Sequence, residues 1–234
     1  EASLDGIPML IISGGIRTDS KNTYQLHDID QHALLGPITK KTYKVESHGQ
    51  IVPSIYEAFK IAHEGEPGPV FIEIPVNLQL FPGEVDEPQA YKYEPAESTP
   101  DRKAIKKAAK QLLDAKQPGL FLGWGAVDAS DLAVRIADFL NAPVSTTLQG
   151  LSAFPANHPL HTGMSFGKAS VPAAENAFKS CDCMLAVATR FSEIATGSFG
   201  LTPPENLIHI DINPKVFNAN YPATVCIEGD SKVV

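Results

Sequence analysis

The chain has 234 residues, which is enough for one or two domains with a buried core. Hydrophobic residues make up 43% and charged residues 20%, a composition that excludes disordered and collagen-like classes. The net charge is −8, and all of the acidic excess lies in residues 1–100. Because no basic stripe is present to hold a phosphate backbone, we expect no nucleic-acid partner.

Apolar runs and cysteines narrow the class further. The longest apolar runs, residues 8–12 and 184–188, are too short to span a bilayer, so we expect no membrane partner. Three cysteines cannot form an even disulfide framework, which favours a reducing cytoplasm. Two of them stand in Cys181-Asp182-Cys183 without a second pair at zinc spacing. We therefore predict no metal site there and expect Cys183 to pack in the core.

Strands and helices are predicted to alternate along the chain. Runs of aliphatic and β-branched residues flanked by Gly or Pro predict strands at residues 8–13, 69–74, 119–122, 143–147, 183–188, 206–212 and 224–227. Helical periodicity predicts helices at residues 50–64, 101–115 and 130–141. In the first helix, Ile51, Ile55, Phe59 and Ala62 are predicted to form the buried face. The alternation predicts an α/β fold with parallel sheets flanked by helices.

Residues 81–100 interrupt this pattern. The segment holds four prolines, five acidic residues and one lysine, and it has no periodicity. It is typical of an extended interdomain linker, and a long surface loop within one domain is the alternative. We therefore predict a first unit at residues 1–80 and a second at 101–234. The first unit has only two clear predicted strands, so we expect it to be part of a domain.

The second unit opens with a strand, a glycine turn and a helix. Gly123 and Gly125 match the first two glycines of a dinucleotide-binding G-x-G-x-x-G motif, but Asp128 stands at the third position. The next predicted strand also lacks an acidic residue for a ribose hydroxyl. Glycines that serve a tight strand-to-helix turn are therefore favoured over a NAD fingerprint.

Several motifs in order resemble thiamine diphosphate enzymes, with a pattern nearest to acetolactate synthase and its relatives. In the first unit they are DGIPMLIISG (residues 5–14), YQLHDIDQ (24–31), GPITK (36–40) and GEPGPVFIEIP (65–75). In the second they are TLQGLSAFP (147–155), HPLHTG (158–163), ATRFS (188–192), IHIDINP (208–214) and the Gly-Asp pair at 229–230. The resemblance implies the later part of a pyrimidine-binding domain, followed by a Rossmann-like central domain.

The family's chemistry follows as an expectation. The resemblance implies thiamine diphosphate and Mg²⁺ in the full-length enzyme, a 2-keto acid substrate, and a homodimer or homotetramer. The reaction would be decarboxylation and carboligation, or the related lyase reaction. The family's catalytic glutamate corresponds to a position upstream of Glu1, and no Gly-Asp-Gly triplet for the metal and diphosphate occurs. We therefore expect the chain alone to be inactive, the alternatives being a non-catalytic FAD- or ADP-binding module and a dimerisation scaffold.

Site residues also follow from the resemblance. Gln25 is the catalytic candidate, because an amide can both donate to and accept from a keto acid. His27 and Asp28 are expected to structure the same loop. The positions that match the family's dinucleotide site are Gly123, Gly125, Thr147, Leu148, Gln149, Gly163, Met164, Arg190, Asp211, Ile212 and Asp230. Trp124 replaces a small residue of the FAD-binding members, and the run 190–194 lacks their second arginine, so an empty pocket is favoured over bound FAD.

Overall fold

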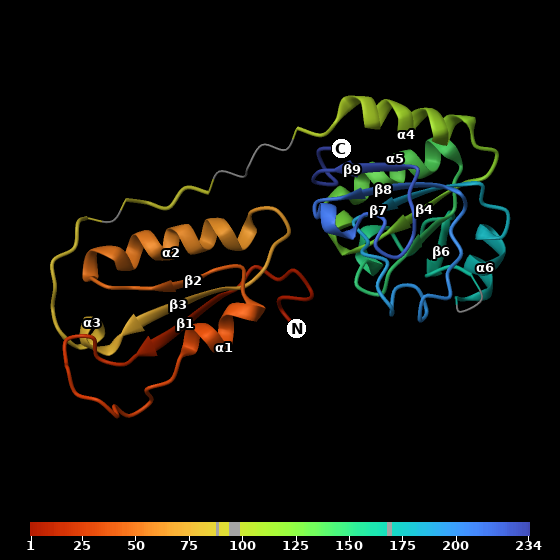
Figure 1. Cartoon of the computed structure of the whole chain (residues 1–234). Coiled ribbons are helices and arrows are strands. Elements are labelled where there is room, and N and C mark those ends of the chain that lie inside the picture. The colour runs from red at the N-terminus through yellow and green to blue at the C-terminus, as the bar shows by residue number, and fades with distance from the viewer. Residues whose placement is uncertain (88, 94–98, 168–169) are drawn as a thin grey trace. The chain divides into compact units, whose positions relative to one another are not determined.

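The computed structural model describes residues 1–87, 89–93, 99–167 and 170–234 (Figure 1). Two compact units make up the chain, Glu1–Glu97 and Ser98–Val234. Within the predicted linker, residues 88 and 94–98 lie outside the described residues. No described part of residues 81–100 forms a helix or a strand.

The first unit is built on a parallel sheet of three strands in the order β1-β3-β2. These strands are β1 (Leu10–Gly15), β2 (Thr42–Lys44) and β3 (Val70–Pro75). The expectation of two strands was therefore wrong. The missed strand, β2, has only three residues and ends on a lysine, so it leaves no apolar run in the sequence.

Helices cover this sheet. They are α1 (Gln31–Leu35), the 3₁₀ helix η1 (Gly36–Ile38), α2 (His48–His63) and α3 (Val76–Leu80). Ala58 and Ala62 of α2 are buried against β3, and Ile51 and Ile55 pack on the same core, as the periodicity predicts. Phe59 is an exception, because its ring lies outside that core.

The segment after α3 explains the position of Phe59. Its ring lies 5.6 Å from that of Tyr91, and the Tyr56 hydroxyl donates to the Gln89 carbonyl oxygen at 2.6 Å. Tyr93 packs against His63 at the end of the same helix. Residues 89–93 therefore lie along the outer side of α2, as Figure 1 shows, and this aromatic contact gives Phe59 a second apolar environment.

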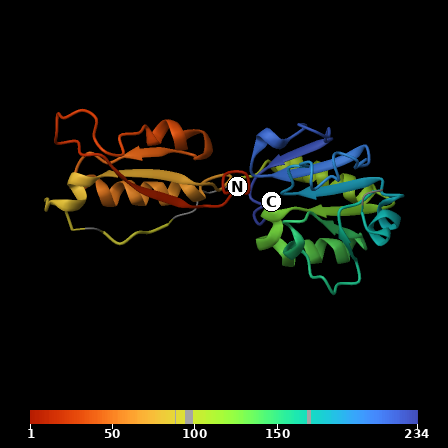
Figure 2. The same cartoon turned by 90° about the horizontal axis from the view of Figure 1, so that it is seen from below.

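The second unit contains a six-stranded parallel sheet in the order β6-β5-β4-β7-β8-β9 (Figure 2). Its strands are β4 (Pro118–Leu122), β5 (Val144–Thr146), β6 (His161–Met164), β7 (Cys183–Val187), β8 (Asn206–Asp211) and β9 (Val225–Glu228). The first strand lies in the middle and the chain winds outward on both sides, which is the Rossmann arrangement. Only β6 was not predicted, because its sequence His-Thr-Gly-Met is not an apolar run.

Helices cover both faces of this sheet. They are α4 (Arg102–Asp114), α5 (Ser130–Leu140) and α6 (Pro172–Phe178), with 3₁₀ helices η2 (Trp124–Ala129), η3 (Leu151–Ala153) and η4 (Pro214–Val216). The Asp101 carboxylate caps α4, and Asn141 ends α5 in the left-handed conformation. The lysines of α4 are exposed, namely Lys103, Lys106, Lys107 and Lys110.

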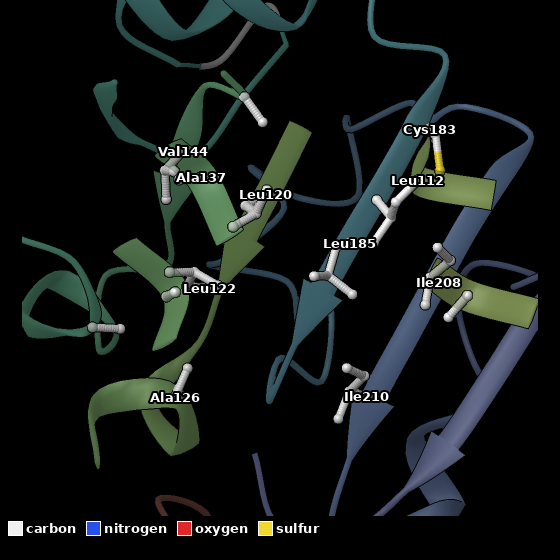
Figure 3. Close-up of a cluster of buried hydrophobic side chains, with 14 of the residues drawn as sticks. Leu112, Leu120, Leu122, Ala126, Ala137, Val144, Cys183, Leu185, Ile208 and Ile210 are labelled. Atoms are coloured by element: carbon white, nitrogen blue, oxygen red, sulfur yellow. The ribbon is translucent and has the colours of Figure 1, made fainter. Parts of the chain in front are cut away.

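Two hydrophobic cores follow from strand alternation. Leu120, Leu122, Leu185 and Ile208 point to the face covered by α4 and α5 (Figure 3). Phe121, Met184, Ala186 and Leu207 point to the opposite face, where they pack with Phe178 of α6. Cys183 is buried in the first of these cores, as expected.

Candidate functional site

A cavity of about 600 Å³ lies at the carboxyl end of β1. Its walls come from the turn after β1, from the loop around Gln25 and from the start of α3. Gln25 is half-buried there, whereas its neighbours Tyr24 and Leu26 are exposed. The Gln25 side-chain nitrogen donates to the carbonyl oxygens of Arg17 at 3.4 Å and Asn22 at 3.3 Å. These long bonds orient the amide, and its oxygen takes no part in them.

The loop holds Gln25 through its own backbone. Tyr24 and His27 have φ values of 56° and 65°, in the left-handed region that non-glycine residues rarely adopt. The Asp28 amide donates to the Gln25 carbonyl oxygen at 3.2 Å, which closes a turn. Asp30 then caps α1 by accepting from the Ala33 amide at 2.9 Å. His27 and Asp28 thus shape the loop, in line with their predicted role.

A buried carboxylate lies beneath this loop, and the sequence analysis did not single it out. Glu73, on the central strand β3, is only 5% exposed. Its oxygens lie 3.0 Å from His32 Nε2 and 3.6 Å from Lys44 Nζ. Gly15 passes so close that a Cβ atom there would lie 2.3 Å from the carboxylate. The sequence signal for this site is one acidic residue within an otherwise apolar strand. The partners of that residue could not be inferred, because they lie far away in the sequence.

Glu73 also fixes α1, and α1 in turn borders the cavity. His32 of α1 contacts the carboxylate and packs its ring edge-on against Phe71 at 5.4 Å. The neighbouring Gln31 side chain donates to the Gly14 carbonyl oxygen at 2.8 Å. Both contacts tie α1 to the carboxyl end of the sheet, so the loop that carries Gln25 has an anchored end.

The residues predicted for a dinucleotide all lie at one edge of the six-stranded sheet. Parallel strands end at the same edge, and each of these residues ends a strand or follows one. Gly123 and Gly125 follow β4; Thr147, Leu148 and Gln149 follow β5; Gly163 and Met164 end β6; Arg190 follows β7; Asp211 and Ile212 end and follow β8; Asp230 follows β9. Gln25 belongs to the first unit.

The tightest contact at this edge joins the segments that follow β4 and β7. A Cβ atom on Gly123 would lie 1.8 Å from the Ala188 carbonyl oxygen, and one on Gly125 would lie 2.9 Å from the Ala188 Cβ. Ala188 itself has a φ of 50°. This is the point from which the chain winds in both directions, where open α/β sheets usually bind ligands. The glycines are thus required by the close backbone approach.

Polar side chains at this edge mostly serve local turns. The Thr147 hydroxyl accepts from the Gly150 amide at 3.0 Å. Asp211 accepts from the Asn213 amide at 2.9 Å, and Asp230 accepts from the Lys232 amide at 2.8 Å. Leu148, Gln149, Met164 and Arg190 are exposed. The carboxylates therefore stabilise the turns that follow β8 and β9.

His209 is a further residue that the sequence reading did not single out. It lies on β8, fully buried, with its ring edge-on to Phe191 and Phe217. Its Nε2 lies 2.8 Å from the Thr189 carbonyl oxygen. Burial lowers the pKa of His209, so the neutral ring is favoured. His209 thereby supports the turn that presents Arg190.

The sequence profile described as "Thiamine pyrophosphate enzyme, central domain" matches residues 105–234. This chain belongs to the thiamine pyrophosphate enzyme family. The resemblance drawn from the motifs is thereby confirmed. The match covers the Rossmann-like unit, including the edge with Gly123 and Arg190.

Curated relatives of this chain extend the match to both units. The probable acetolactate synthase large subunit of Methanocaldococcus jannaschii is 35% identical over 100% of this chain and 41% of its own length. The Corynebacterium glutamicum acetolactate synthase large subunit is 32% identical over 100% of this chain and 38% of its own length. The Escherichia coli acetolactate synthase isozyme 2 large subunit is 32% identical over 98% of this chain and 42% of its own length. The chain thus spans about two fifths of these relatives.

A solved structure supports the α/β fold. It is described as "a putative thiamin diphosphate-dependent enzyme isolated from Mycobacterium smegmatis". It matches with a TM-score of 0.79 over 99% of this chain and 45% of its own, at 23% identity. The predicted fold, parallel sheets flanked by helices, is therefore confirmed.

The cofactors of the family can be tested against the residues of this chain. In the described residues, no three His, Cys, Asp or Glu side chains gather where they could hold a metal ion. For FAD, the Rossmann strand order fits the cofactor. Two side chains count against FAD: Trp124, 52% exposed, stands beside the glycine turn where a dinucleotide would lie, and the Asp211 carboxylate accepts from its own turn. No helix in the described part of the chain is long and apolar enough to cross a membrane.

Proposed function

We propose that this chain is part of an enzyme of the acetolactate synthase type, which decarboxylates a 2-keto acid and transfers the two-carbon unit to an acceptor. The supporting observation is the alignment with acetolactate synthase large subunits at 32–35% identity over 98–100% of the chain. The alignment runs through both units, so it includes the cavity at Gln25 as well as the central domain. A relationship confined to the Rossmann-like fold would not support a specific reaction.

Gln25 is the residue that we assign to the reaction. Thiamine diphosphate supplies the electron sink when it is bound. The carboxamide at the cavity can donate to the substrate carbonyl oxygen and accept from a hydroxyl group. Its two long bonds to loop carbonyl oxygens orient it and can be exchanged for bonds to a ligand. The ligands of Mg²⁺ and diphosphate would come from outside this chain, so the isolated chain is proposed to be inactive.

The assay uses a full-length enzyme that contains this segment, with a 2-keto acid such as pyruvate as substrate. Gln25→Ala is expected to lower kcat/KM by about 10- to 100-fold, the range for one positioned hydrogen-bonding group. Gln117→Ala, at an exposed glutamine of the second unit, is the matched control and is expected to leave kcat/KM unchanged. Equal kcat/KM values in the two variants would show that Gln25 has no role in the reaction.

The isolated 234-residue chain provides a second test. Calorimetry with thiamine diphosphate and Mg²⁺ is expected to give no binding in the micromolar range. Micromolar affinity would contradict the proposal that the metal and diphosphate ligands lie elsewhere. The absence of acetolactate formation by this chain alone is the matching kinetic expectation.

A second candidate is a nucleotide-binding module without catalysis. It is favoured by the Rossmann strand order and by the glycine turn at its switch point. Calorimetry with FAD, ADP and NAD tests it. Binding of ADP or FAD that is lost in Arg190→Ala would support this role. No measurable binding of any of the three nucleotides would contradict it. We favour an empty or vestigial pocket because of Trp124.

Assembly is proposed to be a homodimer or homotetramer. The edge strand β1 supports this, because within the described residues it pairs only with β3 and its Ile12 is 54% exposed. A scaffold role limited to dimerisation predicts association of the isolated chain, and a strict monomer in analytical ultracentrifugation would count against that role. All three cysteines are free thiols, which suits the proposed cytoplasmic location.

A further inference from the structure

The cavity at the carboxyl end of β1 is lined by one side chain with a permanent positive charge. Arg17 stands in the turn after β1 and is among the described residues that line the cavity, together with Gln25 and Gln79. No aspartate or glutamate is among these described lining residues. Their other polar side chains are amides, a hydroxyl and the imidazole of His27. The charge at this cavity therefore favours an anionic ligand.

The backbone around Arg17 is fixed by α3. The Thr18 amide and hydroxyl both donate to the Asn77 side-chain oxygen, at 3.0 Å and 3.3 Å. Asn77 belongs to α3 and is buried. Figure 1 shows α3 at the end of the sheet to which β1 points. On the other side, the Gln25 side-chain nitrogen contacts the Arg17 carbonyl oxygen at 3.4 Å. Arg17 and the Gln25 amide are thus held as neighbours.

The guanidinium group of Arg17 is held in one orientation. Its Nε and Nη2 atoms donate to the two carboxylate oxygens of Asp19, at 2.8 Å and 2.7 Å. Its central carbon lies 5.4 Å from the centre of the Phe81 ring. A guanidinium has five N–H groups, and the pair with Asp19 uses two of them along one edge. The hydrogen bond from Arg17 to Asp19 raises the pKa of Arg17, so its charge is retained.

The pair with Asp19 leaves Arg17 available to a ligand. Both side chains are partly exposed, Arg17 at 46% and Asp19 at 40%. Ion pairs that water reaches contribute little, because solvent screens the charges. A second carboxylate can therefore bind the other edge of the guanidinium or exchange with Asp19 at small cost. Asp19 is then a competitor that weakens the binding of an anion without preventing it.

We propose that Arg17 binds the carboxylate of the 2-keto acid, while the Gln25 amide contacts its keto oxygen. This inference rests on the proposed function and adds a specificity-determining residue to it. The planar fork of arginine matches a carboxylate, since two parallel N–H groups can donate to its two oxygens. A neutral acyloin, the substrate of the related lyase reaction, has no carboxylate and gains nothing from this contact. Arg17 therefore favours 2-keto acids over acyloins.

The test titrates pyruvate into the 234-residue chain and follows the Nε–H signals of its arginines by NMR. The chain has four arginines, Arg17, Arg102, Arg135 and Arg190. The Arg17 signal is identified by its loss in Arg17→Gln. Acetoin, a neutral acyloin, is titrated in parallel at equal ionic strength. Pyruvate is expected to shift the Arg17 signal to saturation and to leave the other three in place, and acetoin is expected to shift none of them.

Three variants measure how charge sets the affinity for pyruvate, with the Gln25 side-chain amide signal as the common probe. Arg17→Gln is expected to weaken binding at least about tenfold, the effect of losing a hydrogen bond to a charged group. Asp19→Asn is expected to tighten binding about two- to fivefold, because it removes the competing charge and keeps an oxygen that accepts from Arg17. Arg135→Gln, at an exposed arginine of the second unit, is the matched control and should bind pyruvate unchanged.

Several outcomes would overturn the proposal. The Arg17 signal could stay in place up to about 100 mM pyruvate, well above a millimolar Kd. All four arginine signals could move alike, which would report a general effect of ions. Acetoin could shift the Arg17 signal as pyruvate does, or Arg17→Gln could bind pyruvate as tightly as the original chain. These results differ from a failure of the proposed function, which is judged by pyruvate turnover in the unmodified full-length enzyme.

Discussion

The Nε2 atom of His209 on β8 lies 2.8 Å from the carbonyl oxygen of Thr189 in the turn after β7. The neutral ring that carries its proton on Nε2 donates this bond. The turn contains Ala188 and Phe191 with φ values of 50° and 49°, so its backbone is held in a sparsely populated conformation. A buried side chain on one strand thus helps to fix the turn that closes against Gly123.

This contact predicts a pH dependence of stability. Burial lowers the pKa of His209 in the folded chain below the ordinary histidine value of about 6.5. The unfolded chain therefore binds a proton more readily as the pH falls through 6.5, so the contribution of His209 is present above that pH and lost below it. We expect the free energy of unfolding of the second unit, measured in urea, to fall between pH 7 and pH 5.

His209→Gln separates this effect from the other histidines. The glutamine amide can donate to the same carbonyl oxygen but does not titrate. The variant is expected to be less stable at pH 7 and to lose less stability on acidification than the original chain. Parallel pH profiles for the two chains would show that His209 is not the titrating group.

Gly123→Ala tests the close approach of the turns after β4 and β7. Its Cβ atom would lie 1.8 Å from a backbone oxygen, and backbone cannot move aside as a side chain can. We expect a loss of at least about 2–3 kcal/mol in the second unit. Gly49→Ala is the control in α2, where no atom lies within 4 Å, and should gain about 0.5–1 kcal/mol in the first unit. Urea unfolding with separate probes for the two units measures both effects. An unchanged free energy of unfolding in Gly123→Ala would contradict the steric explanation.

Strands that are buried on both faces could be predicted from the sequence, because they form apolar runs. Val70–Pro75 and Cys183–Val187 are almost continuous apolar runs because helices cover both sides of their sheets. The short β2 and β6 carry polar residues and are recognisable only through pairing with a neighbour. Phe59 lies outside the predicted buried face of α2 and is 40% exposed, and its ring contacts Tyr91, 32 positions later, which no helical period contains.

The candidate site was predictable only in part, for a related reason. The family resemblance named the residues that follow β4, β5, β7 and β8, and in the structure these residues stand at the carboxyl ends of their strands. Glu73 and His209 stand within apolar strands, which marks them as polar groups that need a partner. Their partners His32 and Thr189 are supplied by tertiary structure, so the sequence could indicate the need but not the contact.

Glu73→Gln tests the buried carboxylate of the first unit. The substitution keeps the shape and removes the charge that faces His32 and Lys44, so both partners lose a charged acceptor. We expect a loss of about 1–3 kcal/mol in the unfolding free energy of the first unit. The matched control is Glu57→Gln, whose partner Lys41 lies at 2.9 Å but in an exposed pair. Screening by water should leave the unfolding free energy of the control nearly unchanged. Equal losses of unfolding free energy in the two variants would mean that burial does not determine how much an ion pair stabilises this unit.

The same variant probes the loop around Gln25. Because Glu73 anchors α1, its replacement should increase hydrogen exchange at the amides of Asp28 and Ala33, which close the loop and the first turn of α1. Exchange in α2 serves as the internal reference. An increase spread evenly over the first unit would indicate global destabilisation without a specific effect on the loop.

The cysteines give a prediction in which burial controls reactivity. Burial raises the pKa of Cys181 to about 12, that of Cys183 to about 11, and also that of Cys226. At pH 8 the thiolate fraction of Cys181 is therefore about a thousandfold smaller than in the unfolded chain, and the thiolate is the reacting form. Labelling with a disulfide reagent should be slow in buffer and should reach three fast thiols in urea. Phe139→Cys, at an exposed position, adds one thiol that should react fast in both. Fast reaction of a native thiol in buffer would show that its strand edge opens locally, because neither Cys181 nor Cys183 can ionise readily where it is buried.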